Sequence, residues 1–173
     1  GYQRVLEHFS GAKVLGVTAT PDRGDRRNLG TFFETLAYEY KLTSAIKDGF
    51  LCRISAQTIP LSLDLTGVGV QNGDFKAGEL GTALDPYLGQ IAGEMAKTCA
   101  GRKTVVFLPL IATSRKFPRL LAERGMNAME VNGESRDRAE VLAAFDAAGP
   151  GAVLCNSMLL TEGWDCPSVD CIV

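Results

Sequence analysis

The sequence is poor in the residues and segments that mark several large protein classes. Its single histidine and its five cysteines, none of which forms a CxxC pair, leave little for a Cys/His zinc site. No apolar run approaches the roughly 20 residues that a membrane span needs, and the first residues lack the basic and apolar regions of a secretory signal. We therefore predict no membrane association, a cytoplasmic location and reduced thiols.

A surplus of positive charge is also missing, with a net charge of -2 and an isoelectric point near 5.5. Proteins that bind nucleic acid through its phosphates usually carry a basic surplus, so any such contact in this chain must be local. Four cations lie on or near one predicted helix and are typical either of a nucleic-acid face or of a solvated helix surface. They are Arg115, Lys116, Arg119 and Arg124.

A glycine-rich phosphate loop is absent as well, because no G-x-x-x-x-G-K-[ST] segment occurs anywhere in the chain. The stretch 67–73 resembles a dinucleotide-binding loop in its first two glycines. Its third glycine comes one position late, and no helix clearly follows it. We therefore expect no phosphate cradle in this stretch.

What the sequence does contain is a regular alternation of helical and strand patterns from residue 83 onward. Such alternation predicts parallel βαβ units, and hence an α/β fold with a parallel sheet flanked by helices. Pro118 predicts that its helix either kinks or begins near Phe117. The predicted helices cover residues 83–99, 112–124 and 135–148, and the predicted strands cover 104–108, 128–131, 152–156 and 169–173.

The first part of the chain is less regular. A helix over 2–9, a doubly covered strand over 13–18 and a short helix over 43–49 precede an extended, half-exposed strand over 51–65. Residues 66–81 are dense in glycine and carry the weakest pattern, so we interpret 51–82 as a connector. Because the chain stops inside an apolar strand pattern, we expect the parent protein to continue.

Two polar clusters directly follow predicted strands, the position at which open α/β sheets bind ligands. The first runs over 16–23 and carries the hydroxyls of Thr18 and Thr20, and the second runs over 156–165 and carries Thr161, Gly163, Trp164 and Asp165. A structural explanation competes for each cluster. Threonine hydroxyls can satisfy local backbone groups, acidic residues can open a helix, and the tryptophan can simply pack.

Taken in order, these segments resemble the superfamily 2 helicases, DEAD/DEAH-like and closest to the DNA-repair and restriction branch. Residues 18–20 are similar to motif III of the first RecA-like lobe, and residues 161–165 to motif V of the second. Residues 104–107 stand where motif IV belongs, and 132–138 resemble the glycine turn and helix start that follow it. The resemblance implies that 1–50 end the first lobe and that 83–173 form the second lobe, truncated at its carboxyl end.

The resemblance also implies a role for each matched residue in an ATP-driven motor that steps along a strand, with DNA favoured over RNA. Gly163 and Asp165 face the nucleotide, and Thr18 and Thr20 couple the nucleotide to the strand. The nucleic acid is contacted by Thr161, Gly133 and Phe107. ATP and Mg²⁺ are the implied cofactors, and no residue of this chain is assigned as a metal ligand.

Three family elements are missing from this sequence: the Walker A lysine, the acidic metal motif and the arginine finger of motif VI. Because phosphoryl transfer needs all of these groups in one site, we expect the segment alone to be inactive and to need the remainder of its own chain. Two other hypotheses are a stand-alone α/β ligand-binding domain and a non-catalytic helicase-like interaction module.

Overall fold

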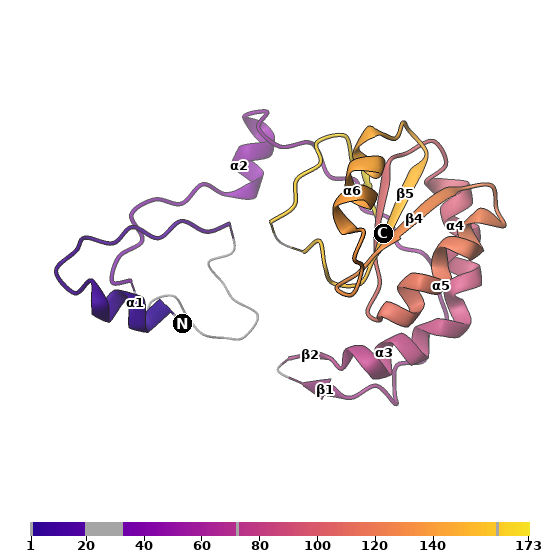
Figure 1. The fold of residues 1–173 in the computed structure, drawn as a ribbon, viewed down its shortest axis with the longest axis horizontal. Helices are drawn as coiled ribbons and strands as arrows, with labels where there is room; N and C mark the ends of the chain where they lie inside the picture. The colour runs from indigo at the N-terminus through magenta and orange to yellow at the C-terminus, as the bar shows by residue number, and fades with distance from the viewer. Residues whose placement is uncertain (1, 20–32, 72, 162) are drawn as a thin grey trace. The chain divides into compact units, whose positions relative to one another are not determined.

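The computed structural model describes residues 2–19, 33–71, 73–161 and 163–173 (Figure 1). The chain divides into two compact units, Gly1–Gln57 and Thr58–Val173, and the second holds the main sheet. The division into an end of one lobe (1–50), a connector (51–82) and a second lobe (83–173) stays a prediction. Within the described ranges, no helix has the length and apolar character needed to cross a membrane.

In the first unit, the described ranges contain the helices α1 (Tyr2–His8) and α2 (Leu42–Lys47). Gly49 follows α2 with a φ of 83°, the left-handed conformation expected of a glycine that ends a helix. The predicted strand over 13–18 is wrong, because these residues are not assigned to any strand and Val17 is 90% exposed. A doubly covered strand needs neighbouring strands and packed helices, and a local apolar pattern cannot supply them.

The predicted strand over 51–65 also does not form. Its later residues instead run extended along the helices of the second unit. Ile59 and Leu61 pack against the core, and the Tyr87 hydroxyl donates a 2.9 Å hydrogen bond to the Ser62 carbonyl. The half-exposed character was therefore predicted correctly, whereas the hydrogen-bond partner is a side chain and not another strand.

The segment that we expected to be unpatterned contains regular structure. Strands β1 (Val70–Gln71) and β2 (Asp74–Phe75) pair antiparallel, and Gly73, directly before β2, has a φ of 88°. Helix α3 (Ala77–Leu84) follows directly. An Asn-Gly pair between two short runs is a strong hairpin signal, and here it identifies a hairpin too short for strand periodicity to detect.

The second unit is built on a parallel sheet, as predicted. Its strands are β3 (Thr104–Phe107), β4 (Asn127–Val131), β5 (Ala152–Asn156) and β6 (Cys171–Ile172). They lie in the order β4-β5-β3-β6, and every neighbouring pair is parallel. All five residues of β5 are buried, because this inner strand is covered on both faces.

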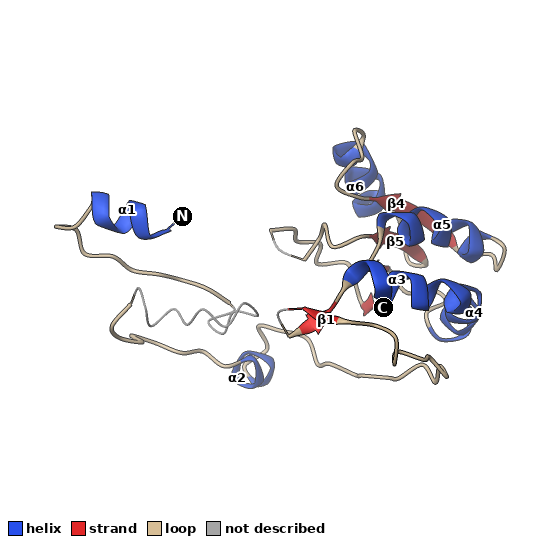
Figure 2. Ribbon diagram, turned by 90° about the horizontal axis from the view of Figure 1, so that it is seen from below, coloured by secondary structure: helices blue, strands red, loops and turns tan. Residues whose placement is uncertain are grey.

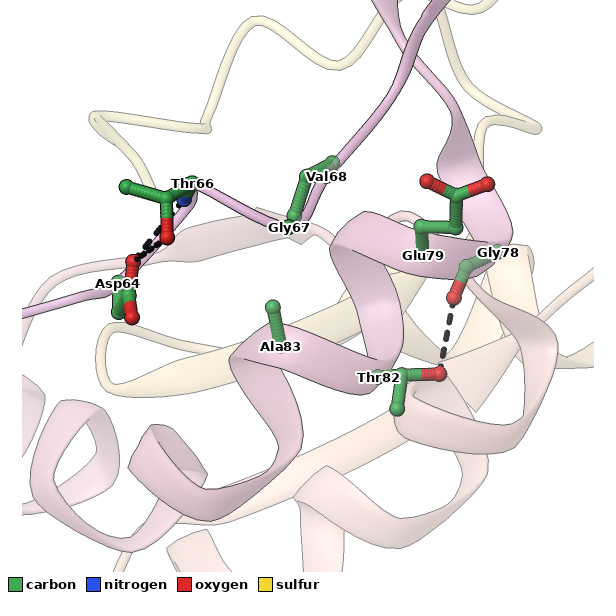
Figure 3. Close-up of a pocket in the computed structure, with 8 residues that line it drawn as sticks. All are labelled: Asp64, Thr66, Gly67, Val68, Gly78, Glu79, Thr82 and Ala83. Atoms are coloured by element: carbon green, nitrogen blue, oxygen red, sulfur yellow. Dashed lines mark hydrogen bonds between the residues drawn. The ribbon is translucent and has the colours of Figure 1, made fainter.

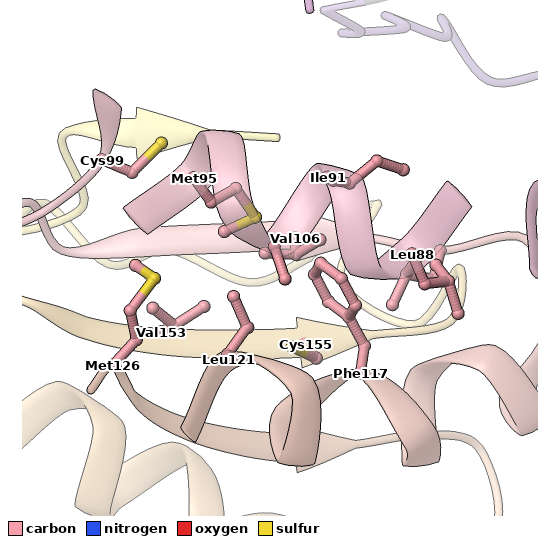
Figure 4. Close-up of a cluster of buried hydrophobic side chains, with 12 residues drawn as sticks. Leu88, Ile91, Met95, Cys99, Val106, Phe117, Leu121, Met126, Val153 and Cys155 are labelled. Atoms are coloured by element: carbon pink, nitrogen blue, oxygen red, sulfur yellow. The ribbon is translucent and has the colours of Figure 1, made fainter. Parts of the chain in front are cut away.

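The helices form one layer on each face of this sheet. α4 (Leu88–Thr98) and α5 (Ile111–Ala122) share a core with Val106 and Val153 (Figure 4). α6 (Arg138–Ala147) contributes Phe145 to a second core, which contains Val105 and Leu154. Neighbouring strand residues thus enter opposite cores, as strand geometry requires, and Figure 2 shows α6 on the opposite side of the sheet from α4.

The observed helices differ from the predicted ones at three places. The predicted helix over 83–99 is divided, because the 3₁₀ turn η2 (Asp85–Tyr87), which contains Pro86, separates α3 from α4. Pro118 instead lies inside α5, which begins at Ile111 and not near Phe117. α6 begins at Arg138, three positions later than predicted, because residues 132–137 form a hydrogen-bonded turn.

Candidate functional site

Three strands of the main sheet end in register and create the candidate site. Phe107 at the end of β3 pairs with Asn156 at the end of β5, and Asn156 pairs with Val131 at the end of β4. We call these aligned ends the carboxyl edge. Because the strands are parallel, the loop 132–137, which carries Gly133, and the loop 157–165, which carries Thr161, both leave from this edge.

Asn156 fixes the start of the loop 157–165. Its side chain is fully buried, and Nδ2 donates a 3.0 Å hydrogen bond to the Val106 carbonyl on the neighbouring strand. Oδ1 accepts hydrogen bonds from the backbone N–H groups of Leu159 at 3.2 Å and Leu160 at 3.3 Å. These two backbone N–H groups are therefore bonded within the chain and are not offered to a phosphate.

The middle of this loop places backbone and hydroxyl groups at the surface. Met158 has a φ of 52°, which is unusual for a residue with a side chain, and Gly163 has a φ of 74°. Nothing lies within 4 Å of a Cβ built on Gly163, so the glycine serves the backbone conformation and not a close approach. Thr161 is exposed, and its hydroxyl donates a long 3.4 Å bond to the Met158 carbonyl.

The far end of the loop is anchored in the second core. The Trp164 ring packs on Phe145 with 6.2 Å between ring centroids, which supports the packing interpretation of the tryptophan. The thiol of buried Cys166 donates a 3.3 Å bond to Asp146 of α6. Asp165 lies between these two anchored residues and is itself exposed.

The loop 132–137 is held in a similar way by Asn132, which is 1% exposed. Its Nδ2 donates to both carboxylate oxygens of Glu130, at 2.9 and 3.1 Å, and its Oδ1 accepts a 2.8 Å bond from the Glu134 N–H. The hydroxyl of buried Ser114 on α5 donates a 2.8 Å bond to the same Glu130 carboxylate. Asn132 therefore connects the loop to β4 and, through Glu130, to α5.

Gly133 is exposed at the turn of this loop, and two arginines lie beside it. Its carbonyl accepts a 3.2 Å bond from Arg138 Nη2. Arg115 Nη2 lies 2.9 Å from the Glu134 carboxylate in an exposed ion pair. Both guanidinium groups therefore lie next to the predicted nucleic-acid contact.

The other three cations of the predicted basic helix have intramolecular partners away from the loop. Lys116 pairs with Asp85 at 2.7 Å, Arg119 with Glu123 at 3.5 Å, and Arg124 donates to the Leu120 and Gly89 carbonyls. These contacts favour the solvated helix surface for the three residues. Arg115 is the member of the group that reaches the loop of Gly133.

The structure places the remaining predicted site residues as follows. Phe107 is half-buried at the carboxyl edge and packs against the second core. Thr18 is exposed in the first unit, and Thr20 lies outside the described residues. Phe107, Gly133 and Thr161 are thus brought to one edge of the sheet, and Gly163 and Asp165 follow on the same loop as Thr161.

A shallow hollow of about 670 Å³ lies elsewhere, between the glycine stretch at 67–69 and α3 (Figure 3). Asp64 accepts bonds from the Thr66 hydroxyl at 2.6 Å and the Thr66 N–H at 2.9 Å, and Glu79 accepts a 2.6 Å bond from the Gly69 N–H. These bonds hold the pKa of each carboxyl below its ordinary value. An ionised, acidic lining repels phosphate, so the hollow does not suit a dinucleotide.

No cluster of three or more His, Cys, Asp or Glu side chains suited to a metal ion occurs in the described ranges.

The buried, hydrogen-bonding role of Asn132 and Asn156 is what our sequence reasoning missed. Their signal is visible in retrospect: Asn132 directly follows a strand, Asn156 ends one, and each precedes a small residue in an exposed loop. A polar amide at the end of a buried apolar strand needs hydrogen-bond partners, and loop amides are the nearest candidates.

Comparison with known proteins finds no matching family model, but curated relatives align over nearly the whole chain. This chain is 26% identical over 187 residues to a Saccharomyces cerevisiae protein named ATP-dependent helicase IRC3. That alignment covers 99% of this chain and 27% of the yeast protein. A Schizosaccharomyces pombe protein named mitochondrial ATP-dependent helicase irc3 is 29% identical over 182 residues, covering 99% of this chain and 30% of that protein.

A third similarity is shorter. Over 66 residues, 38% of this chain and 8% of the relative, the chain is 32% identical to an Escherichia coli type I restriction enzyme EcoAI endonuclease subunit. The chain spans between 27% and 38% of the length of the relatives that it matches nearly end to end. These similarities confirm the helicase resemblance drawn from the motifs.

Proposed function

We propose that this helicase-like chain is part of an ATP-dependent nucleic-acid helicase or translocase that acts on DNA, and that its carboxyl edge grips the strand. The supporting observation is the register of β3, β4 and β5, which brings Phe107, Gly133 and Thr161 to one edge. The helicase names of the long relatives support the ATP-dependent activity, and the restriction-enzyme name of the shorter one supports DNA.

The edge offers the groups that bind a sugar–phosphate backbone without reading its sequence. Hydroxyls, backbone N–H groups and arginines make most contacts to phosphates in protein–DNA complexes, and here they correspond to Thr161, the turn at Gly133 and Arg138. The exposed Arg115–Glu134 pair contributes about 1 kcal/mol or less in water, so Arg115 can exchange the carboxylate for a phosphate at little cost. Because the net charge of the chain is -2, binding must depend on local groups such as these.

On the nucleotide side, Gly163 and Asp165 would contact ATP. The positive φ of Gly163 turns the backbone between the exposed Thr161 and the anchored Trp164. An exposed carboxylate at Asp165 can accept a hydrogen bond from a ribose hydroxyl. When bound, ATP and Mg²⁺ supply the transferable phosphoryl group and the charge that stabilises its departure.

Catalysis by the parent protein then depends on groups from both lobes. Thr18 and Thr20 would couple the nucleotide to the strand, while the Walker A lysine, the acidic metal motif and the arginine finger come from the remainder of the chain. The 173 residues alone should show no phosphate release above background, because positioning and charge stabilisation both fail when these groups are absent.

Binding to labelled single strands tests the proposal in the full-length protein. We expect similar affinities for two unrelated DNA sequences, weaker affinity for RNA, and a steep loss with added salt, since phosphate contacts release counterions. Arg138→Ala should weaken both DNA complexes equally, whereas Arg119→Ala should leave them unchanged. An affinity that does not depend on salt concentration contradicts the assignment of this edge. So does an affinity that falls in Arg119→Ala and not in Arg138→Ala.

A further inference from the structure

Two buried asparagines hold the two loops of the carboxyl edge by the same device. Asn132 and Asn156 are at most 1% exposed. Each uses its side-chain NH₂ to bond a group of the sheet and its side-chain oxygen to accept backbone N–H groups of the loop that follows. We propose that these asparagines are positioning residues that hold the Gly133 and Thr161 loops in the conformation that binds the strand; this inference rests on the proposed function.

The geometry at Asn156 ties the loop to a strand other than its own. The planar amide joins the Val106 carbonyl of β3 to the N–H groups of Leu159 and Leu160. A rotation that improves one of these bonds weakens the others, because all three use one rigid group. The backbone immediately before Thr161 is therefore set by the position of β3.

Asn132 performs the equivalent task through a carboxylate. Its amide donates to Glu130, which also accepts from Ser114 of α5, and its oxygen accepts from the Glu134 N–H. The Asn132 N–H donates a 3.0 Å bond to the Ser135 hydroxyl, and the Ser135 N–H donates a 3.1 Å bond back to the Asn132 carbonyl. The turn at Gly133 is thus closed from both sides.

The register of the sheet does not depend on these side chains, because backbone pairing joins β3, β4 and β5. An apolar residue at either position cannot accept hydrogen bonds from the loop N–H groups. The asparagines therefore hold the loops, and both of these loops carry residues that are proposed to contact the nucleic-acid strand.

A double-mutant cycle in the full-length protein tests the proposal, with fluorescence anisotropy on a labelled single-stranded DNA of mixed sequence as the readout. Asn156→Ala should weaken binding about three- to tenfold, the equivalent of one lost hydrogen bond. Thr161→Val should cause a loss of similar size. Because Asn156 acts through the loop of Thr161, the double variant should bind no more weakly than the weaker single variant.

The two asparagines act on separate loops, so Asn132→Ala combined with Asn156→Ala should show the product of the two single losses. Asn156→Ser should recover part of the affinity, because a serine hydroxyl can still accept a nearby loop N–H. If Asn156→Ala fails to fold, the serine variant provides the same cycle with Thr161→Val.

Met126→Ala is the matched control. Met126 is 9% exposed, packs in the first core and precedes the opposite end of β4. Its loss should lower the melting temperature while leaving the affinity per folded molecule unchanged. Wild-type protein that binds no single strand overturns the proposed function itself. Wild-type binding combined with unchanged affinity in Asn156→Ala, or with fully additive losses in the Asn156 and Thr161 double variant, overturns the positioning role alone.

Discussion

Asn156 and Val106 are joined across neighbouring strands by a 3.0 Å hydrogen bond from the asparagine Nδ2 to the valine carbonyl. The bond adds to the backbone ladder between β5 and β3, and it lies at the end of the sheet where the loop 157–165 departs. Burial makes this bond costly to lose, since the carbonyl and the two loop N–H groups that Asn156 serves are then left without it.

Asn156→Leu should therefore lower the free energy of unfolding by about 2–4 kcal/mol, because it fills the site with a group that cannot satisfy these partners. Urea denaturation followed by circular dichroism measures the change. Thr161→Val, on the exposed part of the same loop, should alter stability by about 0.5 kcal/mol or less. Equal denaturation midpoints for wild type and Asn156→Leu would show that water satisfies these groups and that the amide is not needed.

Thr161→Val in the full-length protein should weaken binding of single strands to a similar degree for two unrelated sequences, because a backbone contact carries no sequence information. ATP affinity measured without nucleic acid should stay the same, since Gly163 and Asp165 are untouched. Anisotropy titrations and nucleotide-binding titrations run in parallel decide the matter. A variant that loses ATP binding and keeps its affinity for single strands would assign Thr161 to the nucleotide site.

Asp165→Ala should reduce ATP turnover by the full-length protein while leaving its melting temperature within a degree or two of wild type. The reason is that Asp165 is exposed between two anchored neighbours, so its removal disturbs little packing. Asp64→Ala, at the distant acidic hollow, is the matched control and should leave turnover unchanged. A large fall in melting temperature with normal turnover per folded molecule would identify Asp165 as a structural residue.

Thiol chemistry provides a test of the second unit's core. Burial, and secondarily the Glu130 carboxylate, raise the pKa of Cys155 to about 12, so almost none of this thiol is ionised at pH 8. Iodoacetamide at pH 8 should alkylate the exposed Cys52 in the native protein and should modify Cys155 only after unfolding. Peptide mass spectrometry follows both sites. Rapid native modification of Cys155 would mean that β5 is not the buried inner strand.

The parts of the fold that the sequence predicted are those determined by local periodicity. The apolar runs of β3 and β5 and the helical spacing of α4 are visible in isolation, and their alternation leaves a parallel sheet as the plausible arrangement. The failures depend on distant partners. Residues 13–18 have the composition of a buried strand, yet such a strand also needs packed elements on both faces, and Val17 is 90% exposed.

The candidate site was predictable in its outline and not in its support. Gly133 and Thr161 stand in loops after predicted strands, so their arrival at one edge follows from parallel topology. The partners of Asn132 and Asn156 could not be foreseen, because Asn156 bonds a residue 50 positions away and Glu130 meets a helix 16 positions away. The order and register of the strands decide these contacts, and neither is encoded in one strand alone.

ATP hydrolysis by the full-length protein, measured as phosphate release with and without single-stranded DNA, tests most directly whether this chain belongs to a nucleic-acid motor. The account predicts Mg²⁺-dependent turnover that single-stranded DNA stimulates severalfold or more. At a fixed ATP concentration, DNA should stimulate the turnover of the Thr161→Val and Asn156→Ala variants less than that of the wild type. Turnover that ignores DNA, or a folded full-length protein that hydrolyses no ATP under any of these conditions, would contradict it.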